Sequence, residues 1–406
     1  MPRFYTKIFT DSGLSFIATF LVLGFQQFLV MPYLGSKYSG SEFGSIIYFL
    51  GIVNIINGSL ASPLSNVRVR NYLAHKEQIN TSSDYNVLHL SSLIVGVTIF
   101  QIIFFWNRAD TSFAFTSIYL VLLMVRTYST VFFRIDRDYV GYFKVSLSIF
   151  TAYLASFFLI QWFEGFKYWL AIYIMGETMA VAYIFHKYNG HNAGVRYKNI
   201  SKHFRKILSE YSGFIMLGFL DLVFIYFDRL LIKPLLGPEE LSTFYILSFF
   251  AKLQPLIISI LAGVLLSYLA TMDIDTIRKN IVKTTIFLGA LAAISFLFVH
   301  TIGPFVISSL YPHMTISNEY KSLLIIINAS YAIISLDKLF RSINVRFTRI
   351  SSLLIRDLCL IILCTVGGIF LVVNYSLLGF CILLLGSALL KFSTTSFLVF
   401  YTLHKR

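Results

Sequence analysis

The chain has 406 residues, of which 57% are hydrophobic, 17% aromatic and only 13% charged, and its mean hydropathy is +0.75. A soluble fold of this length cannot bury so much apolar surface, which excludes a soluble enzyme or scaffold and predicts a polytopic membrane protein. The formal net charge of +14 would indicate nucleic acid or another anionic partner for a soluble protein. In a membrane protein it must be judged by where the Lys and Arg residues lie relative to the spans.

Twelve apolar runs are each long enough to cross about 30 Å of hydrocarbon at 1.5 Å per residue. The runs are continuously apolar rather than alternating, which predicts membrane-spanning helices and not a β-barrel. The first run is longer than a signal-peptide core and lacks a cleavage site, so we expect it to remain as the first span. The predicted spans cover residues 12–31, 43–62, 87–106, 113–133, 143–163, 168–186, 212–232, 243–271, 281–303, 321–340, 350–373 and 377–401.

The distribution of basic residues predicts the orientation. If both termini are cytoplasmic, 23 of the 33 Lys and Arg residues fall in inner segments and 5 in outer segments. This asymmetry satisfies the positive-inside rule, so most of the net charge is a topology signal and nucleic acid is not expected as a partner. The remaining five basic residues lie inside predicted spans: Arg126, Arg229, Lys252, Arg356 and Lys391.

The longest inner connection, 187–209, divides the chain near its middle. Its apolar residues from Ile200 to Tyr211 fall on one helical face, with Lys202, Arg205 and Lys206 elsewhere, which is typical of a helix lying on the inner leaflet and drawn to anionic lipid. The expected domains are an N-terminal six-helix lobe at 1–198, an interfacial amphipathic linker helix at 199–211 and a C-terminal six-helix lobe at 212–406.

Similar turns follow the first span of each half. Pro32-Tyr33-Leu34-Gly35 precedes Ser41-Glu42-Phe43-Gly44, and Pro234-Leu235-Leu236-Gly237 precedes Glu239-Glu240-Leu241-Ser242. The two prolines are 202 residues apart, almost half of the chain. This spacing indicates an internal duplication and predicts two six-helix lobes around a central cavity.

The segments MPYLGSKYSGSEFGSIIYFLG and DRLLIKPLLGPEELSTFYILSFFAK resemble the polysaccharide flippases of the MOP superfamily, the Wzx-like transporters of O-antigen and capsule repeat units. The resemblance covers the whole chain, since twelve spans with both ends inside is also the plan of that family. In the second turn, Leu241-Ser242 replaces the more usual aromatic-Gly pair.

The resemblance implies a flippase in the bacterial cytoplasmic (inner) membrane. Its substrate would be an oligosaccharide linked to undecaprenyl pyrophosphate, moved from the inner to the outer leaflet. A proton or sodium gradient would drive the movement. The resemblance also implies lipid-linked oligosaccharide and membrane lipids as partners, together with a polysaccharide polymerase and a chain-length regulator. A sugar-pyrophosphate headgroup cannot cross hydrocarbon unaided, because its polar groups would lose their hydrogen bonds.

Charged residues in the seventh and eighth predicted spans are the main candidates for a transport site. Asp221 and Lys252 each lie about 14–16 Å below the outer end of their helix, so they could face each other at mid-bilayer. Two interpretations remain open. A structural pair would fix helix register, whereas a functional set would use Lys252 and Arg229 for the headgroup and Asp221, Asp228 or Glu177 for the driving ion.

Other cations are weaker candidates for the headgroup. Arg126 is close enough to an inner helix end for its side chain to snorkel, while Lys391 is too deep to do so and suits a cavity. Arg356 and Asp357 are adjacent, and because helix neighbours do not face each other we expect them to have separate partners.

Uncharged polar residues would line the same cavity. Pro255 should bend the eighth span and free a backbone carbonyl within reach of Lys252. Interhelical hydrogen bonding is the alternative role for each polar residue. The polar cavity residues expected are Gln26, Gln27, Asn54, Asn57 and Gln254.

The sequence contains no catalytic constellation, no phosphate-cradling loop and no metal-ligand or cofactor motif, so we expect neither an enzyme nor a bound cofactor. The rival of another class is a membrane polysaccharide polymerase, which would need a long outer loop, but the longest outer segment is about 304–320. Among transporters, the main alternative is a cation-coupled multidrug exporter of the same superfamily, and it stays ahead of the polymerase.

Overall fold

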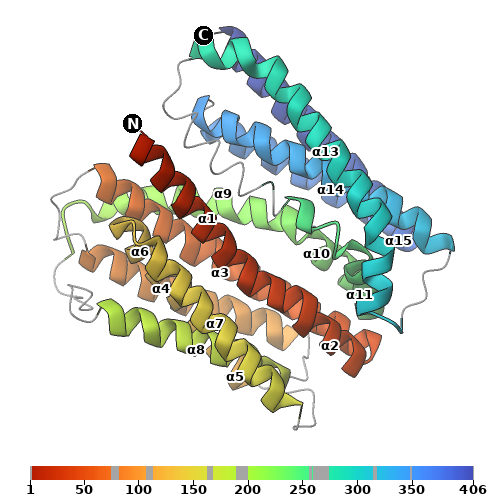
Figure 1. Ribbon diagram of the computed structural model, residues 1–406, viewed down its shortest axis with the longest axis horizontal. Helices are drawn as coiled ribbons and strands as arrows, with labels where there is room; N and C mark the ends of the chain where they lie inside the picture. Colours follow the sequence, from red (N-terminus) through yellow and green to blue (C-terminus); the bar gives the residue numbers. More distant parts are fainter. Residues whose placement is uncertain are drawn as a thin grey trace. The chain divides into compact units, whose positions relative to one another are not determined.

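The computed structural model describes residues 2–74, 82–106, 113–161, 168–188, 200–255, 258, 274–313, 318–347 and 350–405. Nearly all of them are helical (Figure 1). In chain order the helices are α1 (Pro2–Phe25), the π-helix η1 (Gln26–Val30), α2 (Met31–Lys37), α3 (Gly40–Ala74), α4 (Ser82–Trp106), α5 (Phe113–Ser129), α6 (Val131–Asp136), α7 (Tyr139–Ile160), α8 (Trp169–Tyr188), α9 (Phe204–Ile225), α10 (Phe227–Leu236), α11 (Pro238–Ser248), α13 (Ile274–Leu310), α14 (Asn318–Phe347) and α15 (Ile350–Lys405).

Within the described residues, ten helices are long and apolar enough to cross a membrane. One of them belongs to α15, whose 56 residues are interrupted at Ser376, where φ is 50° and ψ is −134°. This kink separates the predicted spans 350–373 and 377–401. The predicted span 243–271 is described as far as residue 255 and at 258, and its remainder lies outside the described residues. The prediction of an all-α polytopic membrane protein is confirmed.

The chain forms two compact units. Unit 1 comprises residues 1–34 and 49–222, and unit 2 comprises 35–48 and 223–406. In unit 1, α7 packs against α1 and α8, and α5 packs against α4 and α8. In unit 2, α14 packs against α13, α11 and α15, and α10 packs against α11 and α15 (Figure 1). The lobe boundaries expected from the sequence stay a prediction.

The C-terminal part of the segment expected to lie on the inner leaflet forms the beginning of a long helix. Helix α9 runs without interruption from Phe204 to Ile225. Ile207 and Tyr211 are each 4% exposed and pack in the core of unit 1 with Leu64 and Val67. Ile200 and Leu208 remain exposed. One part of the apolar face therefore packs against protein, and another part stays exposed. An amphipathic pattern in the sequence does not tell whether an apolar face will contact protein or lipid.

Candidate functional site

The predicted seventh span is broken into two helices. Helix α9 ends at Ile225, Tyr226 leaves the helical conformation with φ −106° and ψ 20°, and α10 begins at Phe227. The break places Asp228 in the first turn of α10, where the positive end of the helix dipole favours a carboxylate. The backbone N–H of Arg229 donates to Oδ1 of Asp228 at 2.9 Å. Asp228 is thus held at a helix start inside a hydrophobic segment.

Lys252 approaches Asp228 from a second irregular point in the backbone. Helix α11 ends at Ser248, and residues 249–252 form turns. Nζ of Lys252 donates to Oδ2 of Asp228 at 2.6 Å. Asp228 is only 4% exposed. Breaks in two helices therefore position Asp228 and Lys252 so that they form a buried ion pair.

This pairing differs from the predicted one, in which Lys252 faced Asp221. The prediction assumed straight helices, but the break at Tyr226 and the turns before Gln254 change the direction of the residues beyond them. Asp221 precedes the break, in the part of α9 that belongs to unit 1, and is half-buried. The carboxylate that unit 2 presents to Lys252 is Asp228.

Arg229 contributes the second cation at this point. Its guanidinium carbon lies 4.7 Å from the centroid of the Tyr226 ring. Its Nε and Nη1 are buried and have no hydrogen-bond partner among the described residues. Burying a charged donor without an acceptor is costly, and a carboxylate or phosphate is the acceptor that a guanidinium fork fits best. We call Asp228, Arg229 and Lys252 the α10 charge cluster.

The residues after Lys252 form a polar connection to neighbouring helices. Oε1 of Gln254 accepts from Oγ of Ser295 at 3.1 Å, while its Nε2 has no partner in the described part of the chain. The carbonyl of Pro255 accepts from Nζ of Lys338 at 3.2 Å. Lys338 lies near the inner end of its predicted span, where a lysine is ordinary, so the sequence alone does not single it out as a site residue.

In unit 1, Arg126 and Glu177 form an ion pair between α5 and α8. Glu177 is 1% exposed, and the Tyr173 ring on the same helix packs against Tyr119 in a tilted arrangement and against Tyr153 edge to face, with centroids 5.6 Å apart in each pair. The sequence predicted separate roles for the two charges, a headgroup cation and an ion-coupling carboxylate. The structure brings them together, so each charge neutralises the other.

The uncharged polar residues predicted for the first lobe lie in η1 and α3. Gln26 and Gln27 begin the π-helix, an unusual helix type that often occurs at functional positions. Asn54 and Asn57 lie in α3 and are half-buried, and Oδ1 of Asn57 has no partner among the described residues. All four belong to unit 1.

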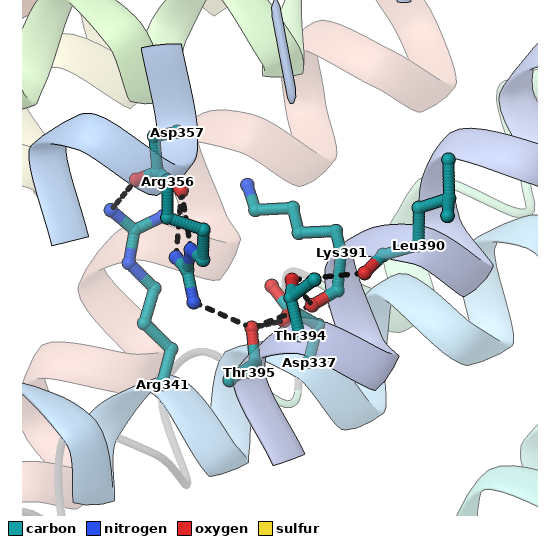
Figure 2. Close-up of polar contacts among 8 residues, drawn as sticks. All are labelled: Asp337, Arg341, Arg356, Asp357, Leu390, Lys391, Thr394 and Thr395. Atoms are coloured by element: carbon teal, nitrogen blue, oxygen red, sulfur yellow. Dashed lines mark hydrogen bonds and ion pairs between the residues drawn. The ribbon is translucent and has the colours of Figure 1, made fainter. Parts of the chain in front are cut away.

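A larger polar network links α14 with both parts of α15 (Figure 2). Arg356 donates to Oδ1 of Asp357 through Nη2 at 2.7 Å and Nε at 3.0 Å, and Arg341 donates to Oδ2 at 3.2 Å. The prediction that Arg356 and Asp357 have separate partners is therefore wrong. A long, flexible arginine side chain can fold back on its neighbour, although the two Cβ atoms diverge.

Thr395 extends this network to Asp337. Nη1 of Arg356 donates to Oγ1 of Thr395 at 2.9 Å, and that hydroxyl lies 2.5 Å from Oδ1 of Asp337 (Figure 2). Asp337, Asp357 and Thr395 are buried. Nζ of Lys391 lies 4.3 Å from the centroid of the Phe224 ring. Arg356 therefore belongs to a polar network in which Asp357 neutralises its charge. Asp337 and Thr395 are not singled out by the sequence, because neither residue is unusual by itself.

Thr395→Val should lower the free energy of unfolding by about 1.5–3 kcal/mol, because hydrogen bonds to charged groups are lost inside the protein. Thr394→Val is the matched control, since within the described part of the chain the Thr394 hydroxyl bonds to two carbonyls of its own helix, those of Leu390 and Lys391. Thermal unfolding of the detergent-purified protein measures both. Equal effects of the two substitutions would contradict the network.

Comparison of the sequence with protein-family models finds no match, and comparison with curated proteins finds none. Comparison of the structure with solved structures does find matches. A MATE protein in complex with MaD3S gives a TM-score of 0.70 at 14% identity, covering 98% of this chain and 97% of that one. An outward-facing multidrug resistance MATE family transporter of the MOP superfamily gives a TM-score of 0.70 at 12% identity, covering 98% of this chain and 96% of that one.

A third match is the lipid II flippase MurJ in an inward closed conformation. It gives a TM-score of 0.64 at 14% identity and covers 98% of this chain and 87% of that one. At these identities the likeness concerns the fold. The chain therefore is a multi-pass membrane protein with the fold of MOP superfamily transporters.

Proposed function

We propose that this protein is a flippase that moves oligosaccharide repeat units, linked to undecaprenyl pyrophosphate, across the bacterial cytoplasmic membrane. Movement runs from the inner to the outer leaflet by alternating access and is driven by a proton or sodium gradient. A polysaccharide polymerase and a chain-length regulator act with it. The occurrence of the same fold in a lipid II flippase supports this proposal.

The observation that carries the proposal is the α10 charge cluster. Two cations and one carboxylate leave it with a net charge of +1, and Nε and Nη1 of Arg229 are buried donors without a partner among the described residues. A pyrophosphate offers acceptor oxygens for these N–H groups, and arginine binds phosphate oxygens through two parallel hydrogen bonds. Arg126 and Arg356, also predicted as headgroup cations, each have a carboxylate partner. Arg229 with Lys252 is therefore the best phosphate site.

Asp228 is the best candidate for ion coupling. It is buried and bound to Lys252 at 2.6 Å, so a proton or sodium ion that competes for the carboxylate would release Lys252. The released ammonium group would then bind a phosphate oxygen. Ion binding and headgroup binding would be coupled through one carboxylate, which is a thermodynamic linkage between two sites.

The second candidate function is multidrug export, which the MATE neighbours favour. An exporter of organic cations would need a site with negative charge or exposed aromatic faces. The net positive charge of the α10 charge cluster opposes binding of a cation there. The positive charge of the α10 charge cluster therefore favours a phosphate-bearing substrate over an organic cation.

Arg229→Gln should slow flipping by about tenfold or more, because hydrogen bonds between charged groups contribute about 1.5–3 kcal/mol. The assay uses proteoliposomes that contain the full chain and undecaprenyl-pyrophosphate-linked oligosaccharide, and it measures how quickly the sugar becomes accessible to an impermeant probe. Arg229→Lys, which keeps the charge, should retain part of the rate. Lys144→Gln removes an exposed charge from α7 and should leave the rate unchanged.

Two results would reject the proposal. One is export of an organic cation by the wild-type protein with no movement of the glycolipid. The other is a flipping rate that stays the same in Arg229→Gln, provided that protein amount and folding match the wild type.

A further inference from the structure

Unit 2 contains a cavity of about 440 Å³ where the two repeated turns meet. Gly35, Ser36, Tyr38 and Gly40 line it from the first turn. The second turn and α11 contribute Glu239 and the hydroxyl residues Ser242 and Thr243, and the end of α13 and the start of α14 contribute Tyr311, His313 and Tyr320. The volume lies within the range of about 300–1,000 Å³ that small-molecule sites occupy. The Lys and Arg distribution predicts the outer side of the membrane for these helix ends.

The first turn is held by a capping box at the start of α3. Oγ of Ser39 donates to Oε2 of Glu42 at 2.9 Å, and the backbone N–H of Ser39 donates to the same oxygen at 3.0 Å. The backbone N–H of Glu42 donates back to Oγ of Ser39 at 3.3 Å. This reciprocal arrangement satisfies free donors at the helix start and stabilises the turn. The residues beside it are consequently held in one conformation.

The second turn depends on Gly237, whose φ of 103° is open to glycine and strained for other residues. Pro238 follows as the first residue of α11. The two turns touch at Gly40, where an added Cβ would lie 3.3 Å from Cγ of Glu239 and 3.5 Å from Oγ of Ser242. The lack of a side chain at Gly40 therefore keeps the space beside Glu239 open.

The cavity lining has the chemistry of a carbohydrate site. Tyr38 and Tyr320 are half-buried and line the cavity, so the C–H face of a sugar ring can pack on their rings and their hydroxyl groups are polar. Tyr311 closes the cavity as a 4% exposed ring that packs against Phe43 and Phe249. The Glu239 carboxylate offers acceptors and the half-buried Thr243 hydroxyl a donor for sugar hydroxyls, while the Ser242 hydroxyl donates to the Glu239 carbonyl at 2.7 Å. No Lys or Arg is among the described residues that line the cavity, so it suits a phosphate group poorly.

We propose that this cavity binds neutral sugar residues of the transported headgroup, an assignment that rests on the proposed flippase function. The α10 charge cluster and the cavity are connected by one helix. Eight residues separate Arg229 from Gly237, a rise of about 12 Å at 1.5 Å per residue. A headgroup whose phosphates bind at Arg229 would reach the cavity through its sugars. The cavity then receives the oligosaccharide at the outer side and favours its exit.

The test measures binding of free sugar to the full chain purified in detergent. The probe is the soluble oligosaccharide that mild acid releases from the lipid-linked glycolipid of the same cells, which carries neither lipid nor phosphate. Saturation-transfer NMR should show contact between the sugar protons and the wild-type protein. Glu239→Gln and Tyr320→Ala should each weaken binding at least tenfold, whereas Lys144→Gln should have no effect.

Absence of sugar contact with the wild-type protein would overturn the proposal, and so would unchanged binding in both cavity variants. Displacement of the sugar by tetraphenylphosphonium at equal concentration would also overturn it, because a cation site at Glu239 would explain the result. Tyr320→Phe keeps the ring and guards against misfolding of the alanine variant. The flipping assay separates the two proposals: free sugar binding without flipping rejects the flippase function, and flipping without free sugar binding rejects the cavity.

Discussion

Glu177→Met is expected to lower the free energy of unfolding by about 3–5 kcal/mol, because it leaves the charge of Arg126 without its partner inside unit 1. The double variant Arg126→Met/Glu177→Met should recover most of this stability. Replacing a buried ion pair by apolar side chains of similar volume is often neutral or stabilising by about 1–4 kcal/mol. Thermal unfolding in detergent, followed by loss of monodisperse protein, compares both variants with the wild type.

The same double variant decides whether Glu177 couples transport to an ion. If the pair is structural, the double variant should flip glycolipid at a rate close to that of the wild type. If the double variant is stable but no longer responds to a proton or sodium gradient, Glu177 belongs to the coupling mechanism. A double variant as unstable as Glu177→Met would contradict the ion pair itself.

Gly44→Ala is expected to destabilise unit 2 by about 3 kcal/mol or more, at or above the upper end for overpacking. An added Cβ would lie 1.7 Å from the carbonyl oxygen of Pro238, a backbone atom that cannot rotate away. The two repeated turns would have to separate. Thermal unfolding of the purified variant should show a clear decrease in Tm, and sugar binding in the cavity should decrease with it.

Gly367→Ala is the matched control for this experiment, because among the described residues its Cβ would meet no atom within 4 Å other than the adjacent residues and the backbone of its own helix. Alanine is the better helix former by about 1 kcal/mol, so this variant should be as stable as the wild type or more so. A Gly44→Ala protein with unchanged Tm would show that the turns are not in contact. Loss of stability in Gly367→Ala would show that glycine itself is required in α15.

The membrane architecture could be predicted from the sequence because hydropathy acts over whole segments. The free energy of transferring a segment into lipid depends on that segment's own residues and not on its neighbours. A run of apolar residues is therefore sufficient evidence of a membrane span. The Ser376 kink falls between two predicted spans for the same reason. The repeated turns were also visible in the sequence, since Pro32-Tyr33-Leu34-Gly35 and Pro234-Leu235-Leu236-Gly237 share a pattern 202 residues apart.

The partners of the charged residues could not be predicted in the same way. Depth along a helix follows from counting residues, and it placed Asp221 opposite Lys252. The backbone break at Tyr226 and the turns at 249–252 bring Asp228 to Lys252 instead. Arg356 pairs with its own neighbour, and Arg126 reaches Glu177 from a different helix.

The sequence by itself determined that the chain spans the membrane many times, and it predicts that its halves repeat and that several charges lie deep within spans. Only the tertiary structure decided which charges are neutralised, that Arg229 keeps buried N–H groups without an acceptor in the described chain, and that the two turns line a cavity with Tyr311 and Glu239. The physical reason is that the two kinds of property depend on different lengths of chain. Transfer into lipid is a property of each segment, whereas an ion pair or a cavity requires atoms from distant segments to lie within a few ångströms, and small backbone irregularities decide that.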